Sequence, residues 1–110
     1  GDVFSMDGDF FDALSNPYRR QIVRMLKWGN YSVNEITKAL EISQPSVSRH
    51  LDVLKKANLV VAERRANQII YSLNLSVMQE FVGKMVEFLD DMKDLKEVRK
   101  YESNKGAYNN

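Results

Sequence analysis

Residues 43–60, which read SQPSVSRHLDVLKKANLV, constrain the fold more than any other part of the chain. The segment opens with a serine suited to cap a helix and a proline in the first turn, where a missing backbone N–H costs nothing. Val47, Leu51 and Leu54 recur at helical spacing, which predicts a helix with one buried face. The opposite face carries short hydroxyl side chains and Arg49. Such a surface is suited to the major groove of DNA, where arginine pairs with guanine.

The length and composition of the chain exclude several classes of protein. At 110 residues it is long enough for a single domain with one core. The absence of cysteine excludes disulfides, thiolate metal sites and thiol redox switches, and the lone histidine, His50, cannot form a metal site by itself. No apolar run approaches the ~20 residues of a membrane span, and no signal peptide is recognisable. We therefore expect a cytoplasmic protein that does not insert into a membrane.

Charge is distributed unevenly along the chain, although the net charge is only +1. Residues 17–73 carry ten lysines and arginines against four acids, a surplus of +6. Residues 1–16 carry −4, and residues 74–110 carry −1. A basic middle segment favours a polyanion as partner, because each phosphate contact releases counterions. An uneven but merely solvated surface is the alternative.

Three helices are expected before the segment described first. Apolar residues at positions 10, 11 and 14 mark a short first helix, and Asn16 with Pro17 is typical of the cap and first position of a second helix. Ser32 and Glu35 have the spacing of a reciprocal capping box and predict a third helix through Leu40. Only three residues then separate this helix from the next one, which is the spacing of a helix-turn-helix.

A β-hairpin is expected after the helix-turn-helix. Residues 59–62 and 68–73 are rich in β-branched and aromatic side chains, and the polar residues 63–67 separate them. Asn67 is the residue best suited to a positive φ at the turn. A hairpin in this position is the wing of a winged-helix domain, which we expect over about residues 59–73.

The last predicted helix spans about residues 76–101, a length of ~39 Å at 1.5 Å per residue. Ser76 and Gln79 have capping spacing at its start. Its apolar residues alternate steps of three and four, and this stripe is too long and wide for the rest of the chain to cover. Residues 103–110 have no apolar pattern and are expected as a flexible tail after a single domain of residues 1–102.

Three segments carry a resemblance to a known family: LSNPYRRQIVRML, SVNEITKALEISQPSVSRHLDVLKKANLV and RRANQIIYSLN. In this order and spacing, over about residues 10–100, they resemble the ArsR/SmtB family of bacterial winged-helix repressors. The cysteine-free chain is most similar to the SdpR-like autorepressors of that family. The resemblance implies a mainly α fold with a small β-hairpin, a winged helix-turn-helix with N- and C-terminal dimerisation helices. One departure is the wing tip, where family members often have glycine and this chain has Ala66 and Asn67.

The predicted contacts with double-stranded DNA lie on a recognition helix of about residues 44–57, on the helix before it and on the wing. Arg49 is expected to read a base edge. His50 either lies near the DNA or braces the helix-turn-helix, and the lysines at the helix end either hold phosphates or keep that end solvated. Arg64 and Arg65 resemble wing arginines that enter a minor groove, attracted by its negative potential. The predicted contact residues are Thr37, Lys38, Gln44, Ser46, Ser48, Arg49, His50, Lys55, Lys56, Arg64, Arg65, Asn67 and Gln68.

Homodimerisation is expected from the last helix. Exposed in a monomer, its apolar stripe would form a patch of the kind that single-chain proteins avoid, whereas a second copy would cover it. The first helix is expected to pack alongside, and a two-fold assembly suits an inverted repeat with half-sites about one helical turn apart. The predicted interface residues are Phe10, Phe11, Leu14, Met78, Phe81, Val82, Met85, Phe88, Leu89, Met92 and Leu95.

The leading interpretation is a homodimeric, sequence-specific transcriptional repressor, and the alternative is a winged-helix module that binds protein. No metal or other cofactor is expected, because metal sensors of the family place thiolates where this chain has Ser32, Val33 and Asn34. An enzyme is not expected, since the chain has no cysteine nucleophile, second histidine or glycine-rich phosphate loop. An inducer, a sequestering protein or no release factor at all are the open alternatives for release from DNA.

Overall fold

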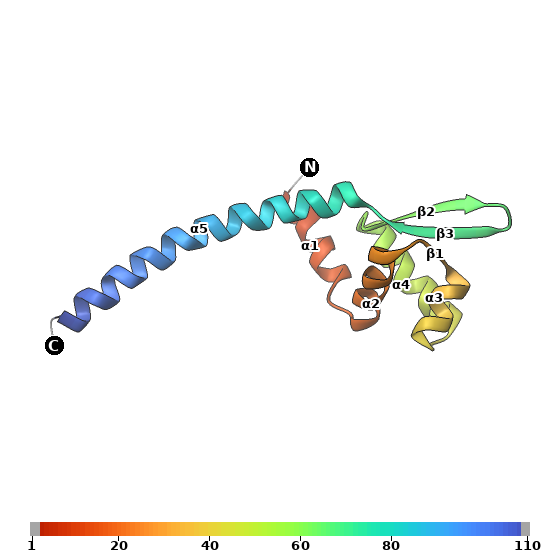
Figure 1. The fold of residues 1–110 in the computed structure, drawn as a ribbon, viewed down its shortest axis with the longest axis horizontal. Helices are drawn as coiled ribbons and strands as arrows, with labels where there is room; N and C mark the ends of the chain where they lie inside the picture. The colour runs from red at the N-terminus through yellow and green to blue at the C-terminus, as the bar shows by residue number, and fades with distance from the viewer. Residues whose placement is uncertain (1–2, 109–110) are drawn as a thin grey trace. The chain divides into compact units, whose positions relative to one another are not determined.

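The computed structural model describes the backbone of residues 3–108 and the side chains of residues 8–93. The chain divides into two compact units, Gly1–Met78 and Gln79–Asn110. The first unit is the predicted winged helix-turn-helix, in which α3 and α4 form the helix-turn-helix and β2 and β3 the wing. In chain order the elements are α1 (Val3–Ala13), α2 (Pro17–Trp28), β1 (Tyr31–Ser32), α3 (Val33–Leu40), α4 (Gln44–Lys56), β2 (Val60–Arg65), β3 (Gln68–Leu73) and α5 (Leu75–Tyr108) (Figure 1).

The starts of three helices are fixed by side chains that the sequence marks as caps. Asn16 Oδ1 accepts two backbone N–H groups at the start of α2. At α3 the N–H of Glu35 donates to Ser32 Oγ (3.2 Å) and the N–H of Ser32 donates to Glu35 Oε1 (3.0 Å), which confirms the predicted capping box. Ser43 Oγ accepts the N–H of Ser46 at the start of α4 (3.3 Å). Each such cap contributes about 1 kcal/mol, so these boundaries follow from the sequence.

The core of the first unit forms where the apolar faces of its helices pack together and against the hairpin. Val47, Leu51 and Leu54 of α4 are fully buried, as their spacing predicts. Ile22 of α2 and Ile36 of α3 are fully buried as well. Burial stabilises by about 25 cal/mol per Å² of apolar surface, so these side chains hold α4 in place. The opposite face of α4 is thereby turned outward.

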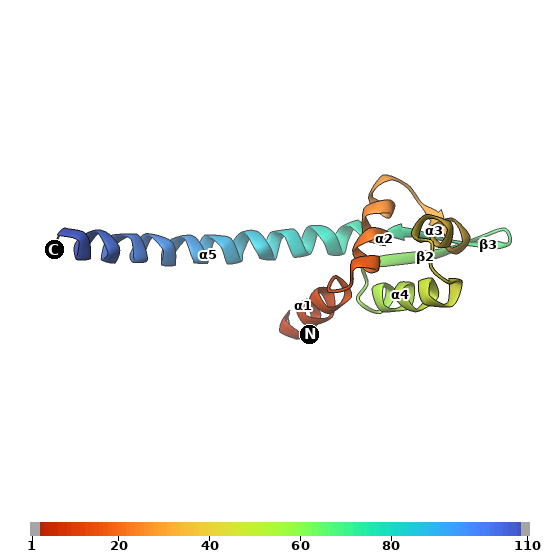
Figure 2. The same ribbon diagram turned by 90° about the horizontal axis from the view of Figure 1, so that it is seen from below.

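The sheet has three antiparallel strands in the order β1–β3–β2. β1 consists only of Tyr31 and Ser32, which pair with β3 immediately before α3 begins. This strand is not predictable from the sequence, because two residues are too few to show the alternation that identifies a strand. β2 and β3 form the predicted hairpin, which extends beyond the ends of α3 and α4 in Figure 2.

The hairpin turn differs from the prediction in two respects. The polar residues 63–67 were expected to separate the strands, but β2 continues through Arg65 because its backbone pairs with β3 up to that residue. Arg65 pairs with Gln68, so the loop consists of Ala66 and Asn67 alone. The positive φ falls on Ala66 (54°) and not, as expected, on Asn67. In both primed turn types the first loop residue has a positive φ, and the register gives that position to alanine. A left-handed alanine costs roughly 1–2 kcal/mol, so the turn is strained.

The start of α5 also differs from the prediction. The helix begins at Leu75, and its capping side chain is Asn74, whose Oδ1 accepts the N–H of Val77 (3.4 Å). The predicted cap at Ser76 is wrong, because β3 ends at Leu73 and Asn74 is the first residue placed to cap. Asparagine is among the strongest helix caps, so it fixes the boundary between wing and helix.

α5 extends to Tyr108, whereas the sequence predicted an end at about Tyr101 and a flexible tail over residues 103–110. Residues 103–108 are helical, because no proline interrupts the helix and each added residue contributes one more backbone hydrogen bond. Asn109 and Asn110 lie outside the described residues. Within the described part of the chain, none of the helices has both the length and the apolar character that crossing a bilayer requires.

Because the strain lies at Ala66 and not at Asn67, we expect different effects from glycine at these two positions. Ala66→Gly should raise the free energy of unfolding by about 0.5–1 kcal/mol, because relief of the left-handed alanine exceeds the entropic cost of glycine. Asn67→Gly, at a residue whose φ is not positive, should give no gain. Chemical denaturation measures both variants, and an Ala66→Gly protein less stable than the wild type would contradict the turn geometry.

Candidate nucleic-acid interface

The outward face of α4 carries most of the residues predicted to contact bases. Gln44, Ser48 and Arg49 are exposed. Ser46 is half-buried, and its Oγ accepts a hydrogen bond from Ser43 Oγ (2.8 Å), so this serine helps to fix the start of the helix. The face therefore presents one long cation among short polar side chains, an arrangement that permits close approach to a groove.

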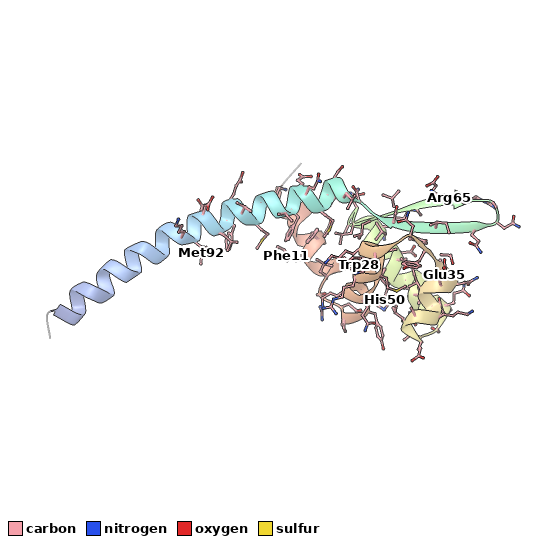
Figure 3. The ribbon with its side chains drawn as sticks, viewed as in Figure 1. Phe11, Trp28, Glu35, His50, Arg65 and Met92 are labelled. Carbon is pink, nitrogen blue, oxygen red and sulfur yellow. The ribbon has the colours of Figure 1, made fainter. Side chains whose placement is uncertain are left out.

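His50 is half-buried and contacts α2 (Figure 3). Arg19 Nη1 lies 3.2 Å from His50 Nδ1, and the Tyr18 and His50 ring centroids are 5.7 Å apart. Burial, followed by the charges of Arg19 and Arg49, lowers the pKa of His50 below its usual value of 6.5. Of the two roles that the sequence leaves open, these contacts support bracing of the helix-turn-helix.

The residues predicted to contact the DNA backbone lie on α3 and at the end of α4. Lys38 is exposed on α3, and Lys55 and Lys56 are exposed in the last turn of α4. Thr37 is half-buried, and its hydroxyl donates to the carbonyl of Val33 (2.7 Å). The hydroxyl proton of Thr37 is therefore used within α3, whereas the lysines add positive charge to the exposed surface of the two helices.

Arg64 and Arg65 lie on opposite faces of the hairpin, because successive side chains of a strand alternate. Both are exposed. Arg65 Nη2 lies 3.5 Å from Glu63 Oε2 on the same face, and Figure 3 shows Arg65 on the hairpin. Arg64 shares its face with Val60, which is only 3% exposed and belongs to the core. The two arginines, expected to act together at the wing, therefore lie on different faces of the hairpin.

The remaining wing residues divide between an exposed tip and a half-buried strand. Asn67 and Gln68 are exposed at the tip. Tyr71 on β3 is half-buried, and burial followed by the carboxylate charge of Asp52 on α4 raises the pKa of this tyrosine above its usual value of 10.0. Tyr71 therefore contributes to packing within the first unit, on the strand paired with both β1 and β2.

Arg19 is the site residue that the sequence analysis missed. Besides its contact with the histidine of α4, its guanidinium donates to the carbonyls of Ala13 (2.7 Å) and Asp12 (3.2 Å) at the end of α1. A signal was present in the spacing, because Arg19 precedes the buried residues Ile22 and Leu26 by three and seven positions. A cation on the buried stripe of a helix indicates a specific set of partners.

The residues predicted for a dimer interface differ in exposure. Phe10 is only 4% exposed because it lies on the inner face of α1, whereas Phe11 beside it is 55% exposed. Leu95 lies outside the residues whose side chains are described. The half-buried members are Leu14, Met78, Phe81 and Met85. The exposed members are Phe11, Val82, Phe88, Leu89 and Met92.

Known proteins are similar to this chain in sequence and in fold. Residues 16–61 match the family described as "Bacterial regulatory protein, arsR family". The chain is 39% identical over 80 residues to the transcriptional repressor SdpR of Bacillus subtilis, which covers 73% of this chain and 89% of that protein. The structure is similar to HlyU from Vibrio cholerae, with a TM-score of 0.61 and 30% identity over 74% of this chain and 91% of that one. It is also similar to the homodimeric winged helix-turn-helix DNA-binding domain of Mb0332 from Mycobacterium bovis, with a TM-score of 0.67 and 27% identity over 81% and 82% of the two chains.

Proposed function

Because the chain belongs to the ArsR family of bacterial regulatory proteins, we propose that it is a transcriptional repressor that binds an inverted-repeat operator as a homodimer. The observation that carries the proposal is the outward face of α4, where Arg49 is exposed among short polar side chains. An arginine in this setting can donate to both O6 and N7 of a guanine, which reads the base directly. As a repressor of this kind, the protein acts in the cytoplasm, where the chromosome lies, and has no catalytic role.

The distribution of charge supports DNA as the partner. Residues 17–73 carry a surplus of +6, and Lys38, Lys55 and Lys56 add exposed cations on α3 and at the end of α4. Phosphate contacts of this kind make affinity fall steeply with added salt. A winged-helix module that binds protein would need no such excess of charge around its helix-turn-helix.

The apolar side chains of α5 support homodimerisation. Val82, Phe88, Leu89 and Met92 are each exposed by 46% or more, and a second copy of the helix would remove this surface from water. The similar Mb0332 domain is itself homodimeric. A two-fold assembly presents two copies of α4, which suits half-sites about one helical turn apart on the DNA.

The proposed repressor senses no transition metal. Ser32, at the place where metal-sensing members of the family have a thiolate, is only 4% exposed and forms the capping box with Glu35. Among the residues whose side chains are described, no group of three or more histidines, aspartates and glutamates is placed to hold a metal ion. A small molecule, a sequestering protein or no release factor at all are the alternatives for release from DNA.

Removal of the Arg49 side chain tests base reading. Arg49→Ala should weaken binding to a duplex that the wild type selects from a random-sequence library by about 5–150-fold, the loss of one bidentate arginine–guanine pair. Fluorescence anisotropy measures the affinity. Arg24→Ala removes the same charge from an exposed position on α2 and should have a much smaller effect. Equal losses in both variants would show that Arg49 acts only through charge.

Substitution of the two wing arginines should lower the affinity for DNA to different extents. Arg64→Ala should lower affinity for the selected duplex by roughly fivefold more than Arg65→Ala, because Arg65 lies on the opposite face and interacts with Glu63. The variants remove the same charge from neighbouring positions, so each is the control for the other. A larger loss in Arg65→Ala would place the DNA on the other face of the hairpin.

A charge on α5 tests the dimer. Phe88→Glu should give a monomer in sedimentation velocity and reduced affinity for the selected duplex, because burial of a carboxylate in an apolar interface costs several kcal/mol. Asp90→Ala changes an exposed residue of the same helix and should leave the dimer intact. A Phe88→Glu protein that remains dimeric would exclude this part of α5 from the interface.

A further inference from the structure

One side chain connects α1, α2 and the proposed recognition helix α4. Arg19, in the first turn of α2, donates through Nε to the carbonyl of Ala13 (2.7 Å) and through Nη2 to the carbonyl of Asp12 (3.2 Å). Its remaining terminal nitrogen, Nη1, lies 3.2 Å from His50 Nδ1 on α4. The planar guanidinium thus has one edge at the end of α1 and one at the middle of α4.

These contacts suit arginine in particular. The last carbonyls of a helix have no partner within it and carry a partial negative charge, so a cation at the end of α1 is favourable. Several N–H groups in one rigid plane allow Arg19 to reach two carbonyls and a ring nitrogen at once. Lysine has the same charge, but its single nitrogen cannot reproduce this fork.

The contact with His50 requires a neutral imidazole. Arginine has no acceptor, so Nδ1 must accept the hydrogen bond and cannot carry a proton. The groups around the ring are the Arg19 guanidinium and the Tyr18 phenol of α2 and the Arg49 guanidinium of α4 itself. The charged residue of α1 in this network, Asp12, takes part through its backbone carbonyl. No carboxylate therefore favours a charged ring among these contacts.

We infer that Arg19 is a positioning residue for DNA recognition, which fixes α4 against α1 through its hydrogen bond to His50. The inference rests on the proposed function. In this role Arg19 acts through His50 and α1, because three of its N–H groups are directed to protein atoms. Since Phe11 of α1 is exposed and belongs to the proposed dimer contact, the link also fixes the recognition helix relative to that contact.

The link depends on pH in a defined direction. Protonation of His50 removes the lone pair that faces Arg19 and adds a third cation beside two others. Because burial and these charges lower the pKa of His50, the folded chain binds the proton less readily than the unfolded chain. The contribution of His50 to stability is complete above pH 6.5 and is lost as the pH falls through the lower folded value. The link should hold at neutral pH and loosen in acid.

The test measures affinity for the duplex selected by the wild type and for a scrambled duplex, at constant ionic strength, at about pH 7.5 and about pH 5.5. Arg19→Ala and His50→Ala should each weaken binding to the selected duplex at neutral pH by about tenfold, and the double variant by no more than either. Arg19→Lys should not restore the affinity. In the wild type, loosening of the link in acid should weaken binding to the selected duplex more than binding to the scrambled duplex. His50→Asn retains an acceptor that cannot titrate, so it should keep near wild-type affinity and lose this difference between the two duplexes.

The outcomes separate the inference from a merely structural role. Circular dichroism confirms that each variant is folded at the assay temperature, and if Arg19→Ala is not folded, the two His50 variants decide the question. Additive losses, unchanged affinity in folded variants, or a His50→Asn protein with the wild-type pH profile would overturn the inference. If the wild type selects no duplex, the proposed function fails together with the inference. If it selects one that the variants bind equally well, only the inference fails.

Discussion

The burial of one face of α4 determines how the first unit is built. Val47, Leu51 and Leu54 are fully buried, and a helix with its apolar face inward must turn its polar face outward. The exposed position of Arg49 is therefore a consequence of the core. The short turn from α3 and the cap at Ser43 then fix where this face begins. The proposed contact between this face and DNA follows from this single packing arrangement.

Local features of the fold could be predicted from the sequence because their causes are local. The capping box of Ser32 and Glu35 and the cap at Asn16 use residues within one turn of each other. The hairpin appeared as two β-rich runs with a polar segment between them. The positive φ expected at Asn67 lies at Ala66, because the strand register decides which of the two residues comes first in the loop. Turn chemistry alone favours asparagine there.

Features that depend on distant partners could not be predicted. Arg19 and His50 are 31 positions apart, so no local spacing brings them together. β1 is a strand only because β3 lies beside it. Strand alternation places Arg64 and Arg65 on opposite faces. Which of the two faces continues the core is decided by the tertiary packing. In each case the residue is visible in the sequence, but its role depends on contacts that form only in the folded chain.

In the proposed function the outward face of α4 reads base pairs in the major groove, once in each half of a symmetric complex. Methylation interference at guanine N7, on a duplex selected by the protein, probes this contact, because N7 lies in the major groove. We expect interference at guanines in two clusters about one helical turn apart and related by a dyad. Binding that tolerates N7 methylation, or interference confined to one cluster, would contradict it.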